Sequence, residues 1–425
     1  MRPAIITATH IMRSASGSII FLLVLLLVNW YVFQALKTVS VNWTGRTRII
    51  VYSIYWLICG LGFALMASLP YVQFDTWPKA VRTYLFAIPV GFFLAQLVSI
   101  PFFLMDDIRR LFQWGAGFFV AKKAAGIEAG EGISRSVFLS WLGLGIGGGL
   151  FGSLLYGFKN KYNYQVRKIQ LAYPNLPKAF KGFKLVHISD IHSGSFTDKE
   201  AVLRGVQLIN EQAADVVLFT GDMVNDRATE MEPFMDVFSR VQAKQGVYST
   251  FGNHDYGDYV RWKTDQEKLA NQNALRKVHA DLGWRLLWDE HVVLQKDGAE
   301  IGLIGVQNIS GKGNFHSYGS LAKALSNKPD TSFNILMSHD PSHWDAEVVK
   351  DHPYIDLTLS GHTHGMQFGV EIPGFRWSPV KWMYKQWAGL YETGNQKLYI
   401  NRGFGFIGYP GRVGILPEIT VIELV

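Results

Sequence analysis

The chain has 425 residues, of which 48% are hydrophobic, and its formal net charge is +7. This length leaves room for more than one domain, and the single cysteine, Cys59, excludes an intrachain disulfide and a cysteine-based zinc site. The positive charge fits contact with anionic lipid. Because the sequence has no basic stripe with regularly interleaved aromatic residues, nucleic acid is not expected as a partner.

Four apolar stretches in the first 158 residues are each long enough to span a bilayer, which takes about 20 apolar residues. None contains Asp, Glu, Lys or Arg, and they run approximately over residues 18–35, 49–69, 84–105 and 137–158. Since three stretches follow the first, we interpret it as a retained anchor rather than a signal peptide. The sequence therefore predicts four transmembrane helices in residues 1–158. Buried helices of a soluble protein are the alternative.

The flanking Lys and Arg residues divide evenly between the two sides of the predicted spans, so they do not predict which side carries the rest of the chain. The fourth stretch contains Gly143-Leu-Gly145-Ile-Gly147-Gly148, which matches a dinucleotide-binding pattern. It lies inside an apolar run and lacks the strand that such a site needs, so close helix packing through Gly145 and Gly149 is the better interpretation. The absence of charge within the spans argues against a transporter.

Residues 159–181 are polar, and we expect them to be a linker into a domain over residues 182–425. In that domain strand-like runs alternate with helix-like stretches, which is typical of an α/β fold. The strand-like runs cover residues 183–188, 215–220, 246–251, 299–306, 333–337, 355–359, 397–401 and 419–424. The helix-like stretches cover residues 198–211, 232–245 and 266–282.

Five of the strand-like runs end in potential metal ligands. In chain order these blocks are Asp190-x-His192, Gly221-Asp222, Gly252-Asn253-His254-Asp255, His339 and Gly361-His362-Thr363-His364. Ligands on loops just past strand ends meet at one edge of an α/β sheet. If the segments stay extended, Asp190 and His192 share a face, and so do His362 and His364. The adjacent glycines let the backbone approach closely.

This mixture of carboxylate, imidazole and amide ligands fits two divalent metal ions of the Mn, Zn or Fe class. Two adjacent metals favour reactions at phosphorus, because they can hold both the attacking and the leaving oxygen. A single block would mean little, but five blocks in this order support one another. The sequence therefore predicts a two-metal site for phosphoester hydrolysis.

The five blocks resemble the calcineurin-like metallophosphoesterase superfamily, whose pattern runs D-x-H, G-D, G-N-H-D/E, H and G-H-x-H. The segment from Tyr399 through Gly411-Arg412 to Glu418 is similar to the membrane-anchored bacterial YkuE-like branch of that superfamily. The resemblance covers roughly residues 165–425. It implies a four-layer α/β/β/α sandwich, which here would follow the four transmembrane helices.

The resemblance also implies a set of metal ligands. The first metal would be held by Asp190, His192 and His364, the second by Asn253, His339 and His362, and Asp222 would bridge the two. One departure from the pattern is visible, because Asn225 stands where relatives usually have Asp. That position is not a ligand, so ligation is not put in doubt.

The catalytic residues are implied in the same way. His254 would stabilise the charge on the phosphoryl oxygens or protonate the leaving group, and Asp255 would orient His254. Capping of the following turn is the alternative for Asp255. Arg402 and Arg412 would meet the substrate phosphate, since guanidinium groups match phosphate oxygens; structural ion pairs are the alternative.

Together these features predict a membrane-anchored dimetal phosphohydrolase that cleaves a phosphodiester or pyrophosphate bond. The anchor suggests membrane lipid as a partner and a lipid-linked or envelope substrate. The aromatic and basic segment over residues 375–387 is expected to lie on lipid headgroups, to form a lid, or to be a packed insertion. A non-catalytic membrane receptor or scaffold is the alternative function; degraded ligands would be its mark, and every ligand position is filled.

Overall fold

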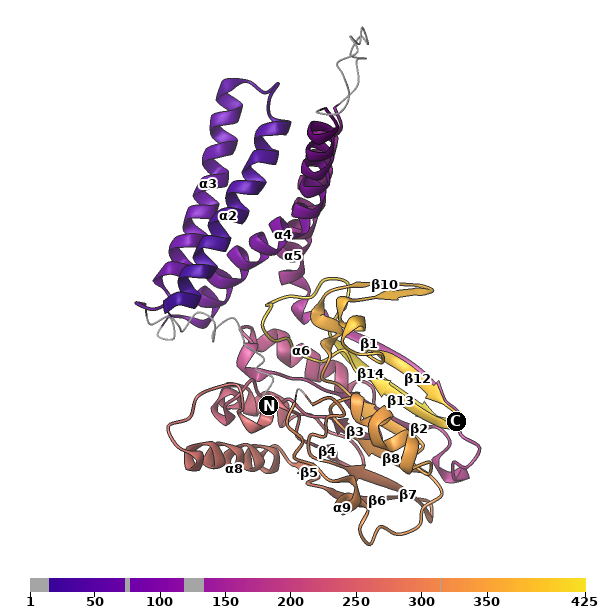
Figure 1. The fold of residues 1–425 in the computed structure, drawn as a ribbon. Helices are drawn as coiled ribbons and strands as arrows, with labels where there is room; N and C mark the ends of the chain where they lie inside the picture. The colour runs from indigo at the N-terminus through magenta and orange to yellow at the C-terminus, as the bar shows by residue number, and fades with distance from the viewer. Residues whose placement is uncertain (1–14, 73–76, 118–133, 314) are drawn as a thin grey trace. The chain divides into compact units, whose positions relative to one another are not determined.

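The computed structural model describes residues 15–72, 77–117, 134–313 and 315–425, and the chain divides into two compact units (Figure 1). The first unit is Met1–Tyr156, and the second is Gly157–Val425. Each has its own hydrophobic core.

The first unit is a bundle of long apolar helices. In the described part of the chain they are α2 (Ala15–Val39), α3 (Gly45–Ser68), α4 (Lys79–Gly117) and α5 (Arg135–Gly157). All four are long and apolar enough to cross a membrane. They overlap the four predicted stretches with ends that differ by a few residues, and α4 extends furthest, beyond its stretch at both ends. Past the apolar run, ion pairs one turn apart support the helix, such as Asp106 with Arg109 at 2.7 Å.

Helices α4 and α5 pack through glycines. A Cβ atom at Gly143 would overlap the Phe103 ring, and one at Gly147 would overlap Ser99 Oγ. Ser99 Oγ also donates a hydrogen bond to the Gly143 carbonyl oxygen, at 2.8 Å. Close packing was therefore predicted correctly, but not the pair of glycines, since no atom of the described residues lies within 4 Å of a Cβ built at Gly145 or Gly149. The pairs Gly143/Gly147 and Gly145/Gly149 have the same spacing, so the sequence alone does not show which pair faces the neighbouring helix.

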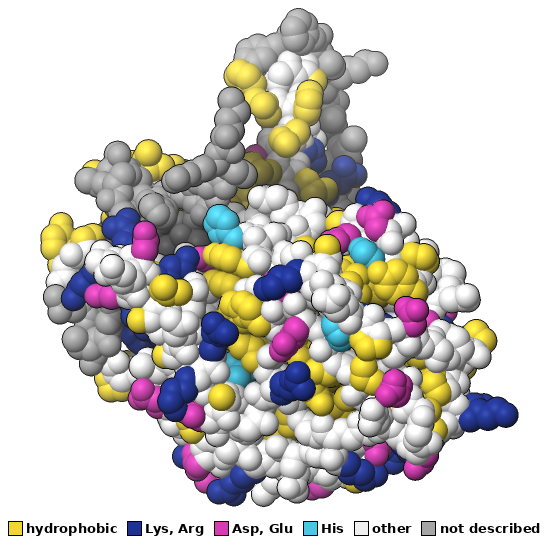
Figure 2. All heavy atoms as spheres, turned by 90° about the horizontal axis from the view of Figure 1, so that it is seen from below, with side chains coloured by type: hydrophobic (Ala, Val, Ile, Leu, Met, Phe, Trp, Pro, Cys, Tyr) yellow, Lys and Arg dark blue, Asp and Glu magenta, His cyan; other side chains and the backbone are white. Residues whose placement is uncertain are grey.

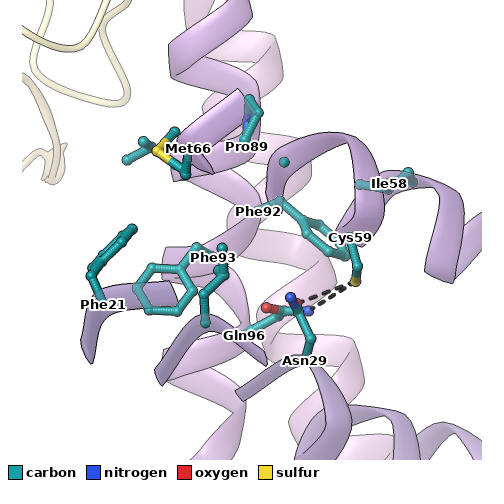
Figure 3. A pocket seen from close by; sticks show the side chains of 12 residues that line it. Phe21, Asn29, Ile58, Cys59, Met66, Pro89, Phe92, Phe93 and Gln96 are labelled. Atoms are coloured by element: carbon teal, nitrogen blue, oxygen red, sulfur yellow. Dashed lines mark hydrogen bonds between the residues drawn. The ribbon is translucent and has the colours of Figure 1, made fainter. Parts of the chain in front are cut away.

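A small polar cluster lies inside the bundle, beside a cavity of about 40 Å³ (Figure 3). Cys59 Sγ donates to Asn29 Oδ1 at 3.2 Å, and Gln96 Nε2 donates to the Tyr55 hydroxyl at 3.0 Å. Polar groups in an apolar bundle need such partners, because neither lipid nor apolar side chains can accept their hydrogen bonds. The cluster therefore links α2, α3 and α4.

The second unit contains two mixed six-stranded sheets among its described residues. The first sheet, in spatial order, consists of β1 (Gln165–Leu171), β14 (Glu418–Leu424), β2 (Phe183–Ile188), β3 (Val216–Phe219), β4 (Val247–Ser249) and β5 (Trp284–Leu286). The second consists of β12 (Gly389–Thr393), β13 (Gln396–Ile400), β9 (Leu357–Ser360), β8 (Asn334–Met337), β7 (Ala299–Gly305) and β6 (Glu290–Lys296). Strands β2 to β5 run parallel, as do β7, β8, β9 and β13.

Side chains alternate between two cores along each central strand, as the pleat requires. Leu185 on β2 packs into the core between the sheets, whereas Val186 packs on the opposite face. On that face the first sheet is covered by α6 (Lys199–Asn210), α7 (Met235–Phe238) and α8 (Asp265–Asp281). The second sheet is covered by α9 (Leu321–Leu325) and the segment leading to α10 (Val349–Asp351). The predicted four-layer α/β/β/α sandwich is therefore confirmed.

The predicted linker over residues 159–181 is wrong where β1 forms. This strand pairs in parallel with β14, from Gln165 with Glu418 to Leu171 with Leu424. Its side chains are mostly half-buried or exposed, because it is the edge strand of the sheet. Edge strands carry polar side chains that discourage further pairing, so the sequence of β1 resembles a linker. The expected helix over residues 232–245 is likewise reduced to α7.

The surface of the second unit carries both signs of charge. On the face drawn in Figure 2, Lys and Arg side chains lie among Asp and Glu side chains, with small apolar areas between them. This mixture is typical of a domain that faces water. One part of the unit departs from the pattern, a separate two-stranded hairpin of β10 (Val370–Ile372) and β11 (Phe375–Trp377), which is considered below.

Candidate metal centre

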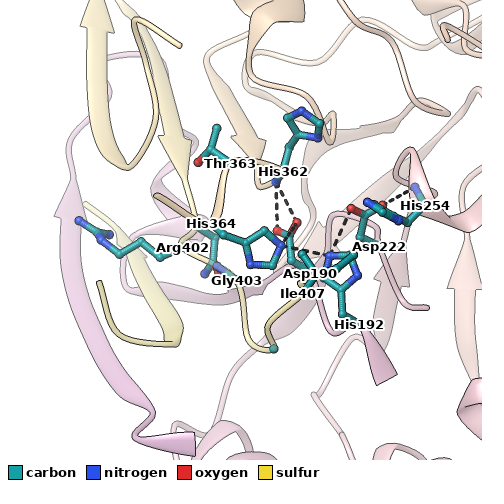
Figure 4. Close-up of polar contacts among 12 residues, drawn as sticks. Asp190, His192, Asp222, His254, His362, Thr363, His364, Arg402, Gly403 and Ile407 are labelled. Atoms are coloured by element: carbon teal, nitrogen blue, oxygen red, sulfur yellow. Dashed lines mark hydrogen bonds and ion pairs between the residues drawn. The ribbon is translucent and has the colours of Figure 1, made fainter. Parts of the chain in front are cut away.

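The potential ligands lie on loops at the carboxyl ends of parallel strands from both sheets. Asp190 and His192 follow β2, Asp222 follows β3, Asn253 follows β4, His339 follows β8, and His362 and His364 follow β9. Figure 4 shows the side chains of Asp190, His192, Asp222 and His364 close to one another, with the backbone N–H of His362 directed at the Asp190 carboxylate. The structure thus brings together all seven residues predicted as ligands.

The ligand atoms form two groups. In the first, His364 Nε2 lies 3.1 Å from His192 Nε2 and 3.2 Å from Asp190 Oδ1. The second contains Asp222, His339 and His362, each with a ligand atom within 4.8 Å of the others. These are the two sets that the resemblance implied, apart from Asn253 and the bridging place of Asp222.

Asp222 and Asn253 complete the arrangement. Asp222 Oδ2 lies 3.1 Å from His339 Nε2 in the second group and 3.5 Å from His192 Nε2 in the first. Asn253 Oδ1 lies 3.1 Å from His339 Nε2 and 2.7 Å from His362 Nδ1. Asp222 therefore stands between the groups, where a bridging ligand would stand, and Asn253 belongs with the second group.

Hydrogen bonds around the site turn lone pairs inward. His339 Nδ1 donates to the Thr220 carbonyl oxygen at 2.7 Å, which leaves its Nε2 lone pair facing Asp222. His362 Nε2 lies 2.8 Å from the Tyr384 hydroxyl, and Asn253 Nδ2 donates to the Tyr259 hydroxyl at 2.8 Å. Lone pairs that converge in this way repel one another unless a proton or a metal ion lies between them, and this mixture of carboxylate, imidazole and amide donors fits divalent metal ions.

Burial and mutual charge shift the pKa values in the site. Burial disfavours the imidazolium of His339, but the Asp222 carboxylate outweighs this and raises the pKa of His339 to about 10. Burial also opposes ionisation of Asp222, yet the neighbouring imidazoles hold its pKa well below the usual value. Burial lowers the pKa of His192 and His362. Without metal, Asp222 and His339 therefore form an ion pair, and a metal must displace the His339 proton.

Removal of metal by chelation is expected to lower the melting temperature of the protein, by about 5–10 °C if metal was saturating. The difference should widen between pH 7 and pH 9. The pKa of His339 in the metal-free fold is raised, so the protonated ring stabilises that fold. This stabilisation is complete below pH 6.5 and is lost as the pH rises through about 10. Metal binding strengthens over the same range, because it needs neutral imidazole. Thermal melts with and without EDTA test this, and identical melts at both pH values would contradict it.

Five of the ligands adopt left-handed backbone conformations. The φ angles are 55° at Asp190, 48° at His192, 59° at Asp222, 72° at His362 and 49° at His364. The condition under which Asp190 and His192, or His362 and His364, would share a face as extended chain is therefore not met, because the chain turns at these residues. The left-handed conformation is strained for any residue with a Cβ atom. It persists where contacts with the surrounding structure hold the backbone in place, which is common at functional sites.

Two glycines let the ligand loops approach one another. A Cβ atom at Gly252 would overlap Asp222 Oδ1, and one at Gly361 would overlap Ser189 Oγ and Asp190 Oδ2. Any larger residue at either position would have to displace a ligand carboxylate or its neighbour. The close approach predicted for these glycines is therefore confirmed.

His254 lies in the site but is positioned by a different residue from the one predicted. Its Nδ1 donates to the Asn225 carbonyl oxygen at 2.8 Å, and its ring centroid lies 4.9 Å from that of His192. Because a carbonyl oxygen can only accept, Nδ1 carries a proton, and Nε2 is the nitrogen available to a substrate. Asn225, noted in the sequence only as a departure, thus orients the ring through its backbone.

Asp255 has another task. Its carboxylate accepts hydrogen bonds from the backbone N–H groups of Gly252 and Asp222, both at 2.8 Å, and of Met223 and Val224, at 2.8 and 3.3 Å. Burial and the charge of Asp222 raise its pKa to about 7. The prediction that Asp255 orients the His254 ring is therefore replaced by one in which it ties together the two loops that carry Asp222 and Asn253.

Arg402 and Arg412 are buried within the fold. Arg402 pairs with Glu418 and Glu371, at 2.5 and 2.6 Å, and Figure 4 shows it directed away from the ligand groups. Arg412 donates to the carbonyl oxygens of Arg402, at 2.7 Å, and Gly405, and burial lowers its pKa to about 9. Neither residue lines the cavity beside the potential ligands, so the structure favours the alternative of structural pairing for Arg402, and contact of either residue with a substrate phosphate stays a prediction. The Arg402 partner Glu371 is 31 residues away in sequence, so the sequence allowed for an ion pair but did not identify this partner.

A cavity of about 210 Å³ opens beside the two ligand groups. Its lining includes the polar residues His192, Asp222, Asn253, His254, His362, Thr363 and His364. The remaining lining residues are mainly apolar, and we call them the apolar wall: Phe315, Met366, Val380, Met383, Tyr384 and Ile407. The sequence did not single out these residues, although Val380, Met383 and Tyr384 lie in the aromatic segment over residues 375–387. A substrate in this cavity would meet both potential metal ligands and apolar side chains.

Comparison with known proteins relates both units of the chain to calcineurin-like phosphoesterases. A family model described as "Calcineurin-like phosphoesterase" matches residues 183–366. A second, described as "Probable Calcineurin-like phosphoesterase, transmembrane domain", matches residues 12–161. The resemblance expected from the five ligand blocks is therefore confirmed, and it extends to the apolar helices, about which those blocks say nothing.

Several relatives match the same regions. The "Uncharacterized metallophosphoesterase YkuE" of Bacillus subtilis is 30% identical over 253 residues, which are 59% of this chain and 81% of that protein. An "Uncharacterized metallophosphoesterase" of Helicobacter pylori is 26% identical over 410 residues, 96% of this chain and 98% of the relative. The "Phosphodiesterase YaeI" of Escherichia coli is 28% identical over 248 residues, 57% of this chain and 82% of that protein.

Proposed function

The chain belongs to the calcineurin-like metallophosphoesterases, and on that premise we propose a membrane-anchored hydrolase that uses two divalent metal ions to cleave a phosphodiester or pyrophosphate bond. The position of Asp222 between the two ligand groups carries the proposal, with Asp190, His192 and His364 on one side and Asn253, His339 and His362 on the other. The chain is a multi-pass membrane protein, so this chemistry takes place on a domain tethered to a bilayer.

When bound, the two metal ions would polarise the phosphoryl group and lower the pKa of water. The residues of the chain supply the rest. Asp222, with a contact to each group, would hold the two ions at a fixed separation. His254, whose Nδ1 proton is held by the Asn225 carbonyl oxygen, would act as an imidazolium and give its Nε2 proton to the leaving oxygen, or donate a hydrogen bond from Nε2 to a phosphoryl oxygen. Its place in the cavity wall gives it access to such a substrate.

The apolar wall of the cavity supports a substrate with an apolar portion next to the scissile bond. Phe315, Met366, Val380, Met383 and Ile407 offer hydrocarbon surface within one cavity that also exposes the ligands. A small ionic phosphate ester would leave that surface in water, whereas a lipid-linked phosphodiester would cover it. We therefore place the bond to be cleaved in a lipid-linked or envelope molecule.

Replacement of His254 with Gln tests the proposal on the full-length protein. We expect kcat for bis(p-nitrophenyl) phosphate to fall by about 10²–10⁴-fold, because proton donation in the transition state is lost. Bound metal should not change, since His254 is not a proposed ligand. A matched control is His291→Gln, which alters a histidine that bonds the Ala324 carbonyl oxygen outside the cavity. Full activity of the His254 variant, or activity that needs no metal, would exclude this mechanism.

A further inference from the structure

The β10–β11 hairpin turns its charged face toward the body of the domain. Glu371 and Arg376 are cross-strand partners on this face. Glu371 pairs with Arg402 at 2.6 Å and with Arg167 at 2.7 Å. The Arg376 guanidinium lies over the Trp387 ring, 5.1 Å from its centroid. Because alternate residues of a strand point to opposite faces, the other face of the hairpin must point away from these anchors.

That other face is apolar and exposed. Val370 pairs with Trp377, and Ile372 pairs with Phe375. Val370, Ile372 and Phe375 are 43%, 58% and 54% exposed. Trp382, on the short 3-10 helix that follows, is 73% exposed and packs edge-on against Trp377, at 5.9 Å between ring centroids. We call Val370, Ile372, Phe375, Trp377 and Trp382 the apolar patch. A hairpin on a water-facing domain ordinarily presents the reverse arrangement, with charge outward.

We propose that the apolar patch docks on the surface of an anionic phospholipid bilayer. Trp, Phe and Ile beside basic residues are the composition of segments that lie in the headgroup region. Lys381 and Lys385 are exposed next to the patch and supply the charge that attracts anionic lipid. A bilayer is also available to this chain in particular, since its own helices span one. Water would otherwise cover four exposed apolar side chains beside the half-buried Trp377, which is unusual for a soluble surface.

The patch adjoins the cavity of the metal centre. Met366 and Met383 line that cavity and are themselves 48% and 53% exposed. Met383 follows Trp382 directly, and Met366 lies four residues before Val370. Docking would therefore bring the apolar wall of the cavity to the headgroup level, where the phosphate of an amphiphile lies. This last step rests on the proposed hydrolase function, whereas docking itself does not.

Site-directed labelling of the full-length protein in vesicles tests the docking. In a Cys59→Ser background, Phe375→Cys and Trp382→Cys carry an environment-sensitive fluorophore; Leu269→Cys on α8, where the native side chain is 56% exposed, is the control. The vesicles contain phosphatidylcholine with or without phosphatidylglycerol, and quenching lipids are spin-labelled near the headgroup. We expect quenching at 375 and 382 to exceed that at 269 by about twofold or more, and to increase with phosphatidylglycerol.

Two outcomes would overturn the docking. Labels at 375 and 382 that are quenched no more than the label at 269 would show that the patch faces water. Labels that are shielded both from spin-labelled lipid and from iodide in solution would show that protein covers the patch, either the helices of the same chain or a second copy. Neither outcome depends on whether the protein hydrolyses anything.

A kinetic arm separates docking from the proposed function. The triple variant Ile372→Ser, Phe375→Ser, Trp382→Ser changes only exposed side chains outside the cavity wall. We expect its activity on soluble bis(p-nitrophenyl) phosphate to equal that of the parent, and its activity on a fluorescent lipid phosphodiester in vesicles to fall by about tenfold. Equal activity of parent and variant on both substrates contradicts a role for docking in catalysis. Absence of hydrolysis by the parent contradicts the proposed function alone.

Discussion

An Asp222→Asn variant is expected to lose nearly all hydrolysis while keeping its fold. Asn has the size of Asp but no charge, and its amide nitrogen cannot bind a metal, so one side of the proposed bridge is lost. Metal-derived stabilisation of the transition state is worth several kcal/mol, and a loss of about 4–6 kcal/mol corresponds to roughly 10³–10⁴-fold in kcat/KM. Metal analysis should show that at least one of the two ions is lost or bound more weakly. The measurement pairs steady-state kinetics with metal content of the same sample.

Asp236→Asn is the matched control for this substitution. Asp236 lies on α7 and is paired with Lys199 at 2.7 Å on the surface. Exposed ion pairs contribute little, so its activity and metal content should equal those of the parent. If Asp222→Asn keeps both full activity and full metal content, Asp222 is not a bridging ligand, and the assignment of two groups around it is wrong.

An Asp255→Ala variant is expected to lose stability rather than only catalytic rate. The carboxylate of Asp255 accepts hydrogen bonds from four buried backbone N–H groups, those of Gly252, Asp222, Met223 and Val224. Each donor left unpaired costs about 1–3 kcal/mol, so the sum is at least about 4 kcal/mol. Since domains are stable by about 5–15 kcal/mol, we expect a domain that is largely unfolded or that melts far below the parent. Thermal melts and limited proteolysis of the second unit measure this.

An Asp255→Asn variant helps to decide between the two roles considered for Asp255, tying the loops together and orienting His254. The amide keeps one acceptor oxygen, so Asp255→Asn should fall between Ala and the parent in melting temperature. If Asp255 acted only by orienting His254, the Ala variant would instead be folded, with normal melting and a low kcat. Such a result would return Asp255 to the role that the resemblance implied and would contradict the loop-tying role.

The sequence predicts those parts of the fold that depend on uninterrupted local signals. The central strand β3 is a continuous apolar run and β2 is a mostly apolar, alternating one, and Asp222 and Asp190 follow them within three residues, so both the strands and the potential ligands could be located. The edge strand β1 could not, because its polar composition is what an exposed edge requires and a linker has the same composition. The helices α2 to α5 were found because the bilayer sets a minimum length of apolar chain.

The roles of charged residues at the site were harder to predict, because their partners are remote in sequence. Arg402 and Glu371 meet only when the hairpin folds back, and Asp255 reaches the loop after β3. The left-handed turns at Asp190 and His362 also depend on contacts from other strands. The argument from extended chain placed each Asp or His pair together correctly, but the pairs meet through turns. The hydrogen bond between Tyr384 and His362 likewise joins residues that are far apart in sequence.

The position of β14 between β1 and β2 has a consequence for biosynthesis. Gln165, a few residues beyond the fourth helix, pairs with Glu418, so the first strand of the catalytic unit has no partner until β14 has left the ribosome. The helices can insert in the membrane long before that moment. The enzyme is thus expected to reach the bilayer as an anchored but unfinished chain, and to gain activity only after its last strand has been translated.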